Sequence, residues 1–324
     1  MTRRPLLAAV GAATAALLLA ACGGVQYADT PVPAAPPTTT APAPTAAATS
    51  CSPSAVTSYA PLPSTDPSQL PASVRQKGRL RVGVSADTLL MSARNPFTGQ
   101  IEGFDIDVAR QIAKAMYGSE DALVPVVVTS ADRIPKLRSG SVDMVARTLS
   151  MTCDRWSQIA FSAEYYQAGL ELLVRKGSSA TTFAQLAASP DAVDKKVCAP
   201  TGTTTYAAVV AQQGITPVGA ATHTACLVLF QDGKVGAIAG DDTVLAGLAE
   251  QDPYAFVPTT QKPLTSEPYG LGFRSDDVTT ARFANAVLDA MKKDGRWQAL
   301  YDRWLAPRLG AGSPPASVYG RPVP

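Results

Sequence analysis

The chain has 324 residues, with 28 basic and 26 acidic side chains and a single histidine. Neither sign of charge dominates, and no basic run is interleaved with aromatic residues, so we expect no nucleic-acid partner. The sequence has no Cys-x-x-Cys spacing, phosphate-binding glycine loop or evident nucleophile with a base, so we expect no metal, no cofactor and no catalysis.

The N-terminal residues have the pattern of an export signal. Arg3 and Arg4 precede an apolar run too short to span a membrane, and a Leu-Ala-Ala-Cys sequence ending at Cys22 resembles a bacterial lipoprotein cleavage site. We expect residues 1–21 to be removed and Cys22 to carry lipid, which would anchor the chain on the extracytoplasmic side of the cell membrane. An ordinary secreted protein is the alternative. Without residues 1–21, the chain carries 26 basic and 26 acidic residues.

The segment after Cys22 is rich in Pro, Thr and Ala. Such a composition buries too little apolar surface to fold, so we expect residues 22–71 to form an extended, lipidated stalk. Residues 72–307 suit two lobes of ~100 to 150 residues each. Residues 308–324 are expected to form a C-terminal tail.

The folded part begins with a strand, a helix and a second strand. Leu80–Ser85 and Val124–Val128 are apolar runs typical of strands. Between them, residues 106–117 place apolar side chains on one face and Arg110 and Lys114 on the other, which predicts a helix packed on a sheet. Asp105 is well placed to cap that helix.

Strands and helices continue to alternate through the rest of the chain. The expected elements are residues 131–138, 142–146, 197–199, 203–212, around 218, 226–231, 237–239, 243–250, 279–291 and 297–304. This order predicts an α/β fold with parallel sheets covered by helices. Two apolar stretches, 169–174 and 269–273, are interpreted as paired crossings between lobe 1 (72–168 and 268–307) and lobe 2 (169–267). A ligand cleft is expected between the lobes, beyond the carboxyl ends of the strands.

Three arginines surround one short apolar strand. Arg133, Arg147 and Arg155 lie close in sequence to the hydroxyl groups of Thr148 and Ser150. A guanidinium group donates two parallel hydrogen bonds to a carboxylate, so this cluster indicates a receptor for an acidic small molecule. Solvated helix and strand residues and ordinary turn chemistry are the alternatives for these side chains.

One motif resembles a known family. Gly103-Phe104-Asp105-Ile106-Asp107-Val108, followed by Ile112, Ala113 and Met116, is similar to the signature of the family 3 solute-binding proteins, the polar amino-acid receptors of ABC transporters. The resemblance implies a two-lobed periplasmic-binding-protein fold of type II, with a mostly parallel sheet flanked by helices in each lobe and two crossing strands as a hinge. It also implies a monomer that closes over an amino acid and presents it to an ABC permease. A sensor for a membrane signalling protein is the alternative output, and an enzyme on the same fold is a remote one.

The resemblance also implies which residues hold the backbone groups of an amino acid. Thr148, Ser150 and Arg155 would bind the α-carboxylate, together with Gly202 and Thr204 at the start of a lobe 2 helix. Asp241, at the end of a strand, would accept the α-ammonium group. Turn chemistry and helix capping are the alternatives for these positions.

The sequence is most informative about the side chain of the expected amino-acid ligand. Ser130, Arg133 and His223 match the branch of the family that binds aspartate and glutamate, where such residues hold the side-chain carboxylate. An arginine found early in lobe 1 of that branch is replaced here by Ser85, and Arg147 is a candidate substitute. Phe97 is the candidate aromatic residue lining the cleft. We therefore expect glutamate or aspartate as ligand, with weaker binding of glutamine and asparagine.

Four cysteines remain when Cys22 is assigned to lipid. An even number in an oxidising compartment predicts disulfides. Three pairings are open, and we favour Cys198 with Cys226 inside one lobe and Cys51 with Cys153 tying the stalk to the other.

Overall fold

The structure is a computed structural model that describes residues 51–258 and 262–324. The expected signal peptide, the lipidation site at Cys22 and the first part of the stalk lie outside these residues. Within the described ranges, no helix is both long enough and apolar enough to cross a membrane.

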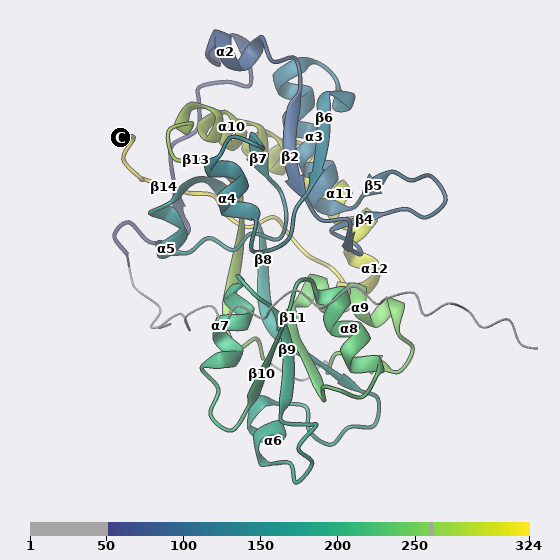
Figure 1. Ribbon diagram of the computed structural model, residues 1–324. Helices are drawn as coiled ribbons and strands as arrows, with labels where there is room; N and C mark the ends of the chain where they lie inside the picture. The colour runs from purple at the N-terminus through teal and green to yellow at the C-terminus, as the bar shows by residue number, and fades with distance from the viewer. Residues whose placement is uncertain (1–50, 259–261) are drawn as a thin grey trace, which may run out of the picture. The chain divides into compact units, whose positions relative to one another are not determined.

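Lobe 1 is built around a strand that is parallel to both of its neighbours. β2 (Leu80–Val84) lies between β6 (Leu123–Val127) and β7 (Met144–Val145). One apolar core, which includes Leu80, Phe104 and Trp297, packs helices onto this sheet. The other elements of lobe 1 are β3 (Asp87–Thr88), β4 (Ser92–Arg94), β5 (Ile101–Glu102), α3 (Phe104–Tyr117), η3 (Glu120–Ala122), α4 (Arg133–Arg138), α5 (Cys153–Trp156), α10 (Val278–Asp294), α11 (Arg296–Trp304) and α12 (Ala306–Leu309). All of these except β3 and η3 are labelled in Figure 1.

The first long helix differs from its prediction at its N-terminus. α3 begins at Phe104, and Gly103 occupies the N-cap position with φ 137°. A Cβ atom on Gly103 would lie 2.4 Å from the Met91 carbonyl oxygen, so the close approach of the chain requires glycine here. The expectation that Asp105 caps this helix was wrong. Its carboxylate instead accepts hydrogen bonds from the Thr148 amide at 2.9 Å and the Tyr165 hydroxyl at 2.6 Å.

Lobe 2 is also built around a strand that is parallel to both of its neighbours. β9 (Lys196–Pro200) lies between β10 (Thr216–Ala220) and β11 (Ala237–Asp241). Two apolar cores pack the helices against this sheet, one around Phe230 and one around Val197. The remaining elements of lobe 2 are α6 (Phe183–Ala188), α7 (Thr204–Val210), α8 (His223–Gln231), α9 (Asp242–Gln251) and β12 (Ala255–Phe256).

Two long strands join the lobes. β8 (Ile159–Arg175) spans 17 residues and is antiparallel to both β13 (Ser266–Arg274) in lobe 1 and β11 in lobe 2. The strands therefore follow one continuous order, β10-β9-β11-β8-β13-β7-β2-β6. Both apolar stretches that we interpreted as crossings lie within β8 and β13, and β8 begins well before the stretch that predicted it. Figure 1 shows β8 running between the two groups of elements.

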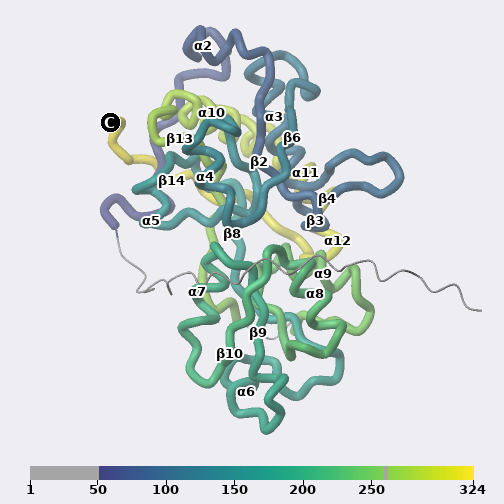
Figure 2. Tube along the Cα trace, in the orientation of Figure 1, coloured from purple at the N-terminus to yellow at the C-terminus, as the bar shows by residue number. Residues whose placement is uncertain are grey.

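Both ends of the described chain pack on lobe 1, which corrects the expected stalk and tail. β1 (Thr57–Ser58) pairs in parallel with β14 (Val318–Tyr319), as the purple and yellow segments of Figure 2 indicate. Tyr59 is 5% exposed and Leu70 is 2% exposed. These few apolar side chains bury enough surface to fix residues 51–70, which include η2 (Pro67–Gln69) and precede α2 (Ala72–Arg75).

Hydrogen bonds and a cation–π contact hold this region to the lobe. The Asn285 side-chain amide donates to the Tyr59 carbonyl at 2.8 Å, and the Ser58 hydroxyl donates to the Phe161 carbonyl at 3.0 Å. The Arg321 guanidinium lies 3.6 Å from the centre of the Trp156 ring. The last residues are therefore part of the fold.

The disulfides have the favoured pairing. Cys51 is bonded to Cys153 and Cys198 to Cys226. The first bond ties the N-terminal segment to α5, and the second ties β9 to α8 inside lobe 2.

Candidate functional site

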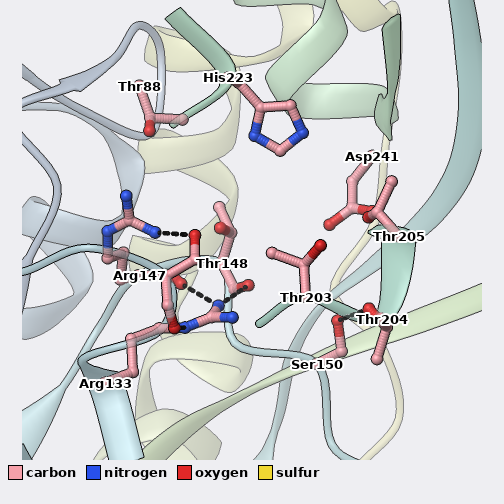
Figure 3. Close-up of a pocket in the computed structure, with 11 residues that line it drawn as sticks. Thr88, Arg133, Arg147, Thr148, Ser150, Thr203, Thr204, Thr205, His223 and Asp241 are labelled. Carbon is pink, nitrogen blue, oxygen red and sulfur yellow. Dashed lines mark hydrogen bonds between the residues drawn. The ribbon is translucent and has the colours of Figure 1, made fainter. Parts of the chain in front are cut away.

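A polar pocket lies between the lobes, where the loop after β7 faces the N-terminal ends of α7 and α8 and the end of β11 (Figure 3). About 330 Å³ of space free of protein atoms lies within it, part of which is open to solvent. Its lining residues are Thr88, Ser130, Arg133, Arg147, Thr148, Ser150, Thr203, Thr204, Thr205, His223 and Asp241.

The lining contains most of the residues predicted from the sequence. Ser130, Arg133, Arg147, Thr148, Ser150, Thr204, His223 and Asp241 all belong to it. Gly202 lies at its edge, where a φ of 73° and a Cβ position 2.9 Å from the Ala131 Cα atom both favour glycine. The segments thus approach each other as expected.

Besides Gly202, two predicted residues lie outside the lining. Phe97 is 95% exposed, at the tip of the β4–β5 hairpin, where the Asn95 side chain accepts hydrogen bonds from the backbone amides of Phe97 and Thr98. The expectation that Phe97 lines the cleft was wrong, because this turn directs the hairpin tip into solvent. Arg155 is buried behind the lining and donates to the Ser150 carbonyl at 2.7 Å.

Arg133 is the first residue of α4, and its guanidinium is committed to the backbone. This buried side chain donates to four carbonyl oxygens, those of Ser130 at 2.9 Å, Arg147 at 3.1 Å, Thr148 at 3.0 Å and Gly202 at 3.3 Å. Three acceptors belong to lobe 1 and the fourth to lobe 2. Burial and the neighbouring Arg155 and Arg147 lower the pKa of Arg133, but a guanidinium remains charged in proteins. Arg133 therefore joins the two lobes beneath the pocket.

Arg147 is buried as deeply but has far fewer partners. The side chain is 5% exposed, and its Nη1 donates to the Ser130 hydroxyl at 2.6 Å. Its Nε is buried without a hydrogen-bond partner among the described residues. Burial lowers the pKa of Arg147, and the acids Asp87, Asp105 and Asp132 partly offset that shift. A buried donor without a partner costs about 1 to 3 kcal/mol.

The loop between these two arginines has an uncommon backbone conformation. Thr148 has φ 39°, in the left-handed region that residues with a side chain rarely adopt. Its amide donates to the buried Asp105 carboxylate and its carbonyl accepts from Arg133. Burial raises the pKa of Asp105 to about 6. Asp105, in the Gly103–Val108 motif, thus holds the loop that follows β7 in place.

Asp241 is the acidic group of the pocket. This residue ends β11, is 6% exposed, and accepts hydrogen bonds from the Tyr269 hydroxyl at 2.5 Å and the Thr205 hydroxyl at 3.4 Å. Burial raises its pKa to about 8, and the nearby Glu267 adds to the shift. A cationic group in the pocket would favour the ionised form and reverse this cost.

Hydroxyl groups from both lobes meet beside Asp241. The Ser150 and Thr204 hydroxyls lie 3.4 Å apart, and Thr204 donates to the buried Glu267 carboxylate at 2.7 Å. Together with Arg133 and Gly202, this contact closes the pocket across the lobes.

His223 is the first residue of α8 and extends into the pocket between Asp241 and Arg147 (Figure 3). Its Nε2 lies 3.3 Å from the Ala239 carbonyl oxygen. Burial lowers the pKa of His223 to about 4, and the positive charge of Arg147 contributes, so the imidazole is neutral near pH 7.

The sequence analysis missed four residues of the site. Thr203 and Thr205 adjoin the predicted Thr204, and their place in the first turn of a helix was the available signal. Thr88 follows the carboxyl end of β2, where ligands of such sheets bind. Glu267 is the second residue of the crossing strand β13, and nothing in its sequence context distinguished it.

The pocket can bind a small zwitterion at both ends. It offers a carboxylate at Asp241, a guanidinium with unused donors at Arg147, and hydroxyl groups between them. No group of His, Cys, Asp and Glu in the described part of the chain has the arrangement needed to hold a metal ion.

The sequence and the fold are similar to those of known proteins. Residues 80–307 match the model of a family described as bacterial extracellular solute-binding proteins, family 3. The ABC transporter glutamine-binding protein GlnH of Bacillus subtilis is 33% identical over 235 residues, which are 72% of this chain and 84% of that protein. The glutamate-binding protein GluB of Corynebacterium efficiens is 29% identical over 248 residues, covering 74% and 81% of the two chains.

Solved structures extend this similarity to the fold. A receptor for L-cysteine from Neisseria gonorrhoeae has a TM-score of 0.67 at 27% identity and covers 74% of this chain and 94% of its own. A mutant of ArgBP from T. maritima has a TM-score of 0.65 at 29% identity, covering 72% and 98%. These similarities confirm the predicted two-lobed periplasmic-binding-protein fold of type II.

Proposed function

Because the chain belongs to the bacterial extracellular solute-binding proteins of family 3, we propose that it binds an acidic amino acid, glutamate or aspartate, between its lobes. Glutamine and asparagine are weaker ligands in this proposal. The relatives whose names include glutamine and glutamate support an amino-acid ligand of this size.

The observation that carries the proposal is the buried Arg147 guanidinium. Of its two terminal nitrogens, only Nη1 has a hydrogen-bond partner among the described residues, and the guanidinium lies across the pocket from the Asp241 carboxylate (Figure 3). A side-chain carboxylate would satisfy these donors, while the α-ammonium group of the same molecule would neutralise Asp241. Arg147 therefore takes the main role that we first gave to Arg133, because the donors of Arg133 already serve four carbonyl groups.

The α-carboxylate has its own place in this arrangement. The hydroxyl groups of Ser150 and Thr204 face each other from the two lobes, and Arg155 supports Ser150 through its carbonyl. A carboxylate at this place would accept a charge-assisted hydrogen bond from the Ser150 hydroxyl, and a second one from Thr204 once that hydroxyl turns away from Glu267. The ligand then contacts both lobes, which favours the closed conformation that a membrane partner would recognise.

Calorimetry of residues 51–324 with glutamate, aspartate, glutamine, asparagine and histidine tests the proposal. We expect the acids to bind about 10- to 100-fold more tightly than the amides, since loss of one charge-assisted pair costs about 1.5 to 3 kcal/mol. Tighter binding of glutamine than of either acid would contradict it.

A pair of variants separates the role of Arg147 from general electrostatics. Arg147→Met should remove most of the preference for acids over amides. Arg138→Met is the matched control, because Arg138 is an exposed residue at the end of α4. An equal loss of preference in both variants would exclude a direct contact between Arg147 and the ligand.

The location and the partner complete the proposal. Lipid on Cys22 would hold the protein at the outer face of the cell membrane, beside an ABC permease that receives the amino acid. Cys22→Ala should release the protein from the membrane fraction while leaving its ligand affinity unchanged. Crosslinking in intact membranes should recover a permease, and recovery of a membrane signalling protein instead would favour the sensor alternative.

A further inference from the structure

The hydrogen bonding of the single histidine bears on how the pocket distinguishes an acid from an amide. The Ala239 carbonyl can only accept a hydrogen bond, so the Nε2 of His223, 3.3 Å away, must carry the proton of the neutral ring. The Nδ1 atom then has a lone pair and accepts. Figure 3 shows this second nitrogen on the side of the ring that faces Thr88 and Arg147.

An acceptor at this place treats the two classes of ligand differently. A side-chain amide supplies an oxygen for Arg147 and an N–H group for Nδ1, so it matches the neutral ring. A side-chain carboxylate has no hydrogen to donate, and its negative charge would face the lone pair of Nδ1. The mismatch disappears when Nδ1 takes a proton from solvent and becomes a donor.

We propose that His223 makes ligand selection depend on pH, by taking up one proton when a side-chain carboxylate enters the pocket and none when a side-chain amide does. This inference rests on the proposed function of the pocket. In the ligand-free protein the imidazole stays neutral because burial and Arg147 hold its pKa near 4. The bound carboxylate raises that pKa, since an opposite charge at hydrogen-bond distance favours the protonated ring.

Several other charged groups face His223 and set the size of the effect. Arg147 and Arg133 oppose protonation of the ring, and Asp87 in β3 favours it. Asp241 also titrates, because its pKa is raised to about 8 in the empty pocket. Every amino acid brings an α-ammonium group that ionises Asp241, so this proton release is common to acids and amides. The difference between the two ligands therefore isolates His223.

Linkage gives the direction of the pH effect. Affinity for the acid, relative to the amide, rises as the pH falls through the bound-state pKa of His223 and levels off below the free-state value near 4. Between those two values the ratio of the dissociation constants of glutamine and glutamate should rise by up to about tenfold per pH unit.

The experiment compares glutamate with glutamine on a protein without a histidine tag. Because the chain has one histidine, its imidazole proton resonance can be followed by NMR without assignment. We expect the resonance to titrate at clearly higher pH with glutamate bound than with glutamine bound. Calorimetry in buffers of different ionisation enthalpy should show more proton uptake for glutamate, by up to one proton. His223→Gln should abolish that difference.

Each outcome decides a separate question. Equal proton counts and equal imidazole titration with two saturating ligands would overturn this inference and leave the proposed function intact. A proton difference that persists in His223→Gln would also overturn it, because another group would then bind the proton. Failure of both acids to saturate the protein would overturn the proposed function and this inference with it.

Discussion

The two ends of the pocket hold their charged groups in different ways. At one end, the Asp241 carboxylate accepts hydrogen bonds from Tyr269 and Thr205. At the other end, Arg147 donates to Ser130 while its Nε has no partner within the described residues. The protein supplies two hydrogen-bond donors to the first end, where ionisation of Asp241 still needs a cation, and it supplies one acceptor to the guanidinium at the second end.

From this difference we infer that the two ends of the pocket have different roles in ligand binding. In the proposed function, the Asp241 end serves the ammonium group that every amino acid carries, so the protein can supply most of its partners in advance. The Arg147 end would serve the group by which amino acids differ, and unsatisfied donors there would penalise any ligand that lacks matching acceptors. Variants at the two ends should therefore lose different properties.

The largest effect is expected at the common end. Asp241→Asn should weaken glutamate and glutamine alike, by about 3 to 5 kcal/mol, because the ligand ammonium would be buried without its counter-ion. Calorimetry with both ligands measures this loss. Asp242→Asn is the matched control: the neighbouring acid accepts from the Tyr166 hydroxyl outside the pocket lining and should change affinity little. A loss confined to glutamate would contradict these different roles.

Variants of Arg133 and Arg147 should differ in stability and in ligand preference. Arg133→Met should lower the free energy of unfolding by about 2 to 4 kcal/mol, because buried carbonyl groups lose their donor, and should weaken acids and amides equally. Arg147→Met should leave stability unchanged or slightly higher, since it removes a donor that lacks a partner. Urea denaturation together with calorimetry separates the two. Similar loss of stability in both variants would count against the distinction.

Closure can be perturbed without changing either end. A Cβ atom on Gly247, inside α9, would lie 2.5 Å from the Leu89 carbonyl oxygen of lobe 1. Gly247→Ala should therefore weaken both ligands by roughly tenfold, or ~1.4 kcal/mol, by opposing closure. Without ligand it should raise stability by up to about 1 kcal/mol, because alanine favours the helix. Lower stability together with unchanged affinity would rule out this explanation.

A further prediction concerns the pH dependence of stability when the pocket is empty. Burial raises the pKa of Asp241 to about 8, above its ordinary value of 3.8, so the folded state binds this proton more tightly than the unfolded state. The resulting stability is fully present below the ordinary value and is lost as the pH rises through about 8. Thermal unfolding of the ligand-free protein should show this decline, and Asp241→Asn should flatten it. An equal slope in the variant would assign the decline to other buried carboxyls, such as Glu164, whose pKa is raised to about 7.

The fold was largely predictable because its elements follow local apolar patterns. α3 was expected over residues 106–117 and spans Phe104–Tyr117, and the strand before Asp241 was found as β11. Periodicity identified these elements because each packs one face on a sheet. Residues 51–71 were misjudged because their few apolar side chains are dispersed among prolines, and only the surface of lobe 1 gives them a partner.

The site was predictable in membership but not in roles. The positions of Ser130, Thr148 and Asp241 follow from loops at strand ends, which a sequence can locate. The contrast between Arg133 and Arg147 depends on which carbonyl groups each guanidinium reaches after folding, and no local pattern encodes that. Phe97 was misplaced for a similar reason, since an aromatic residue near a cleft in sequence can still occupy the tip of a hairpin.

The pairing of β1 with β14 has a practical consequence for anyone wishing to turn this receptor into an optical biosensor. Fluorescent proteins fused directly to residue 51 and to residue 324 would both sit on lobe 1, near one another, and their separation would hardly respond when the lobes move. A reporter inserted into an exposed loop of lobe 2, such as the turn after α6, paired with one at the C-terminus, spans the moving boundary instead.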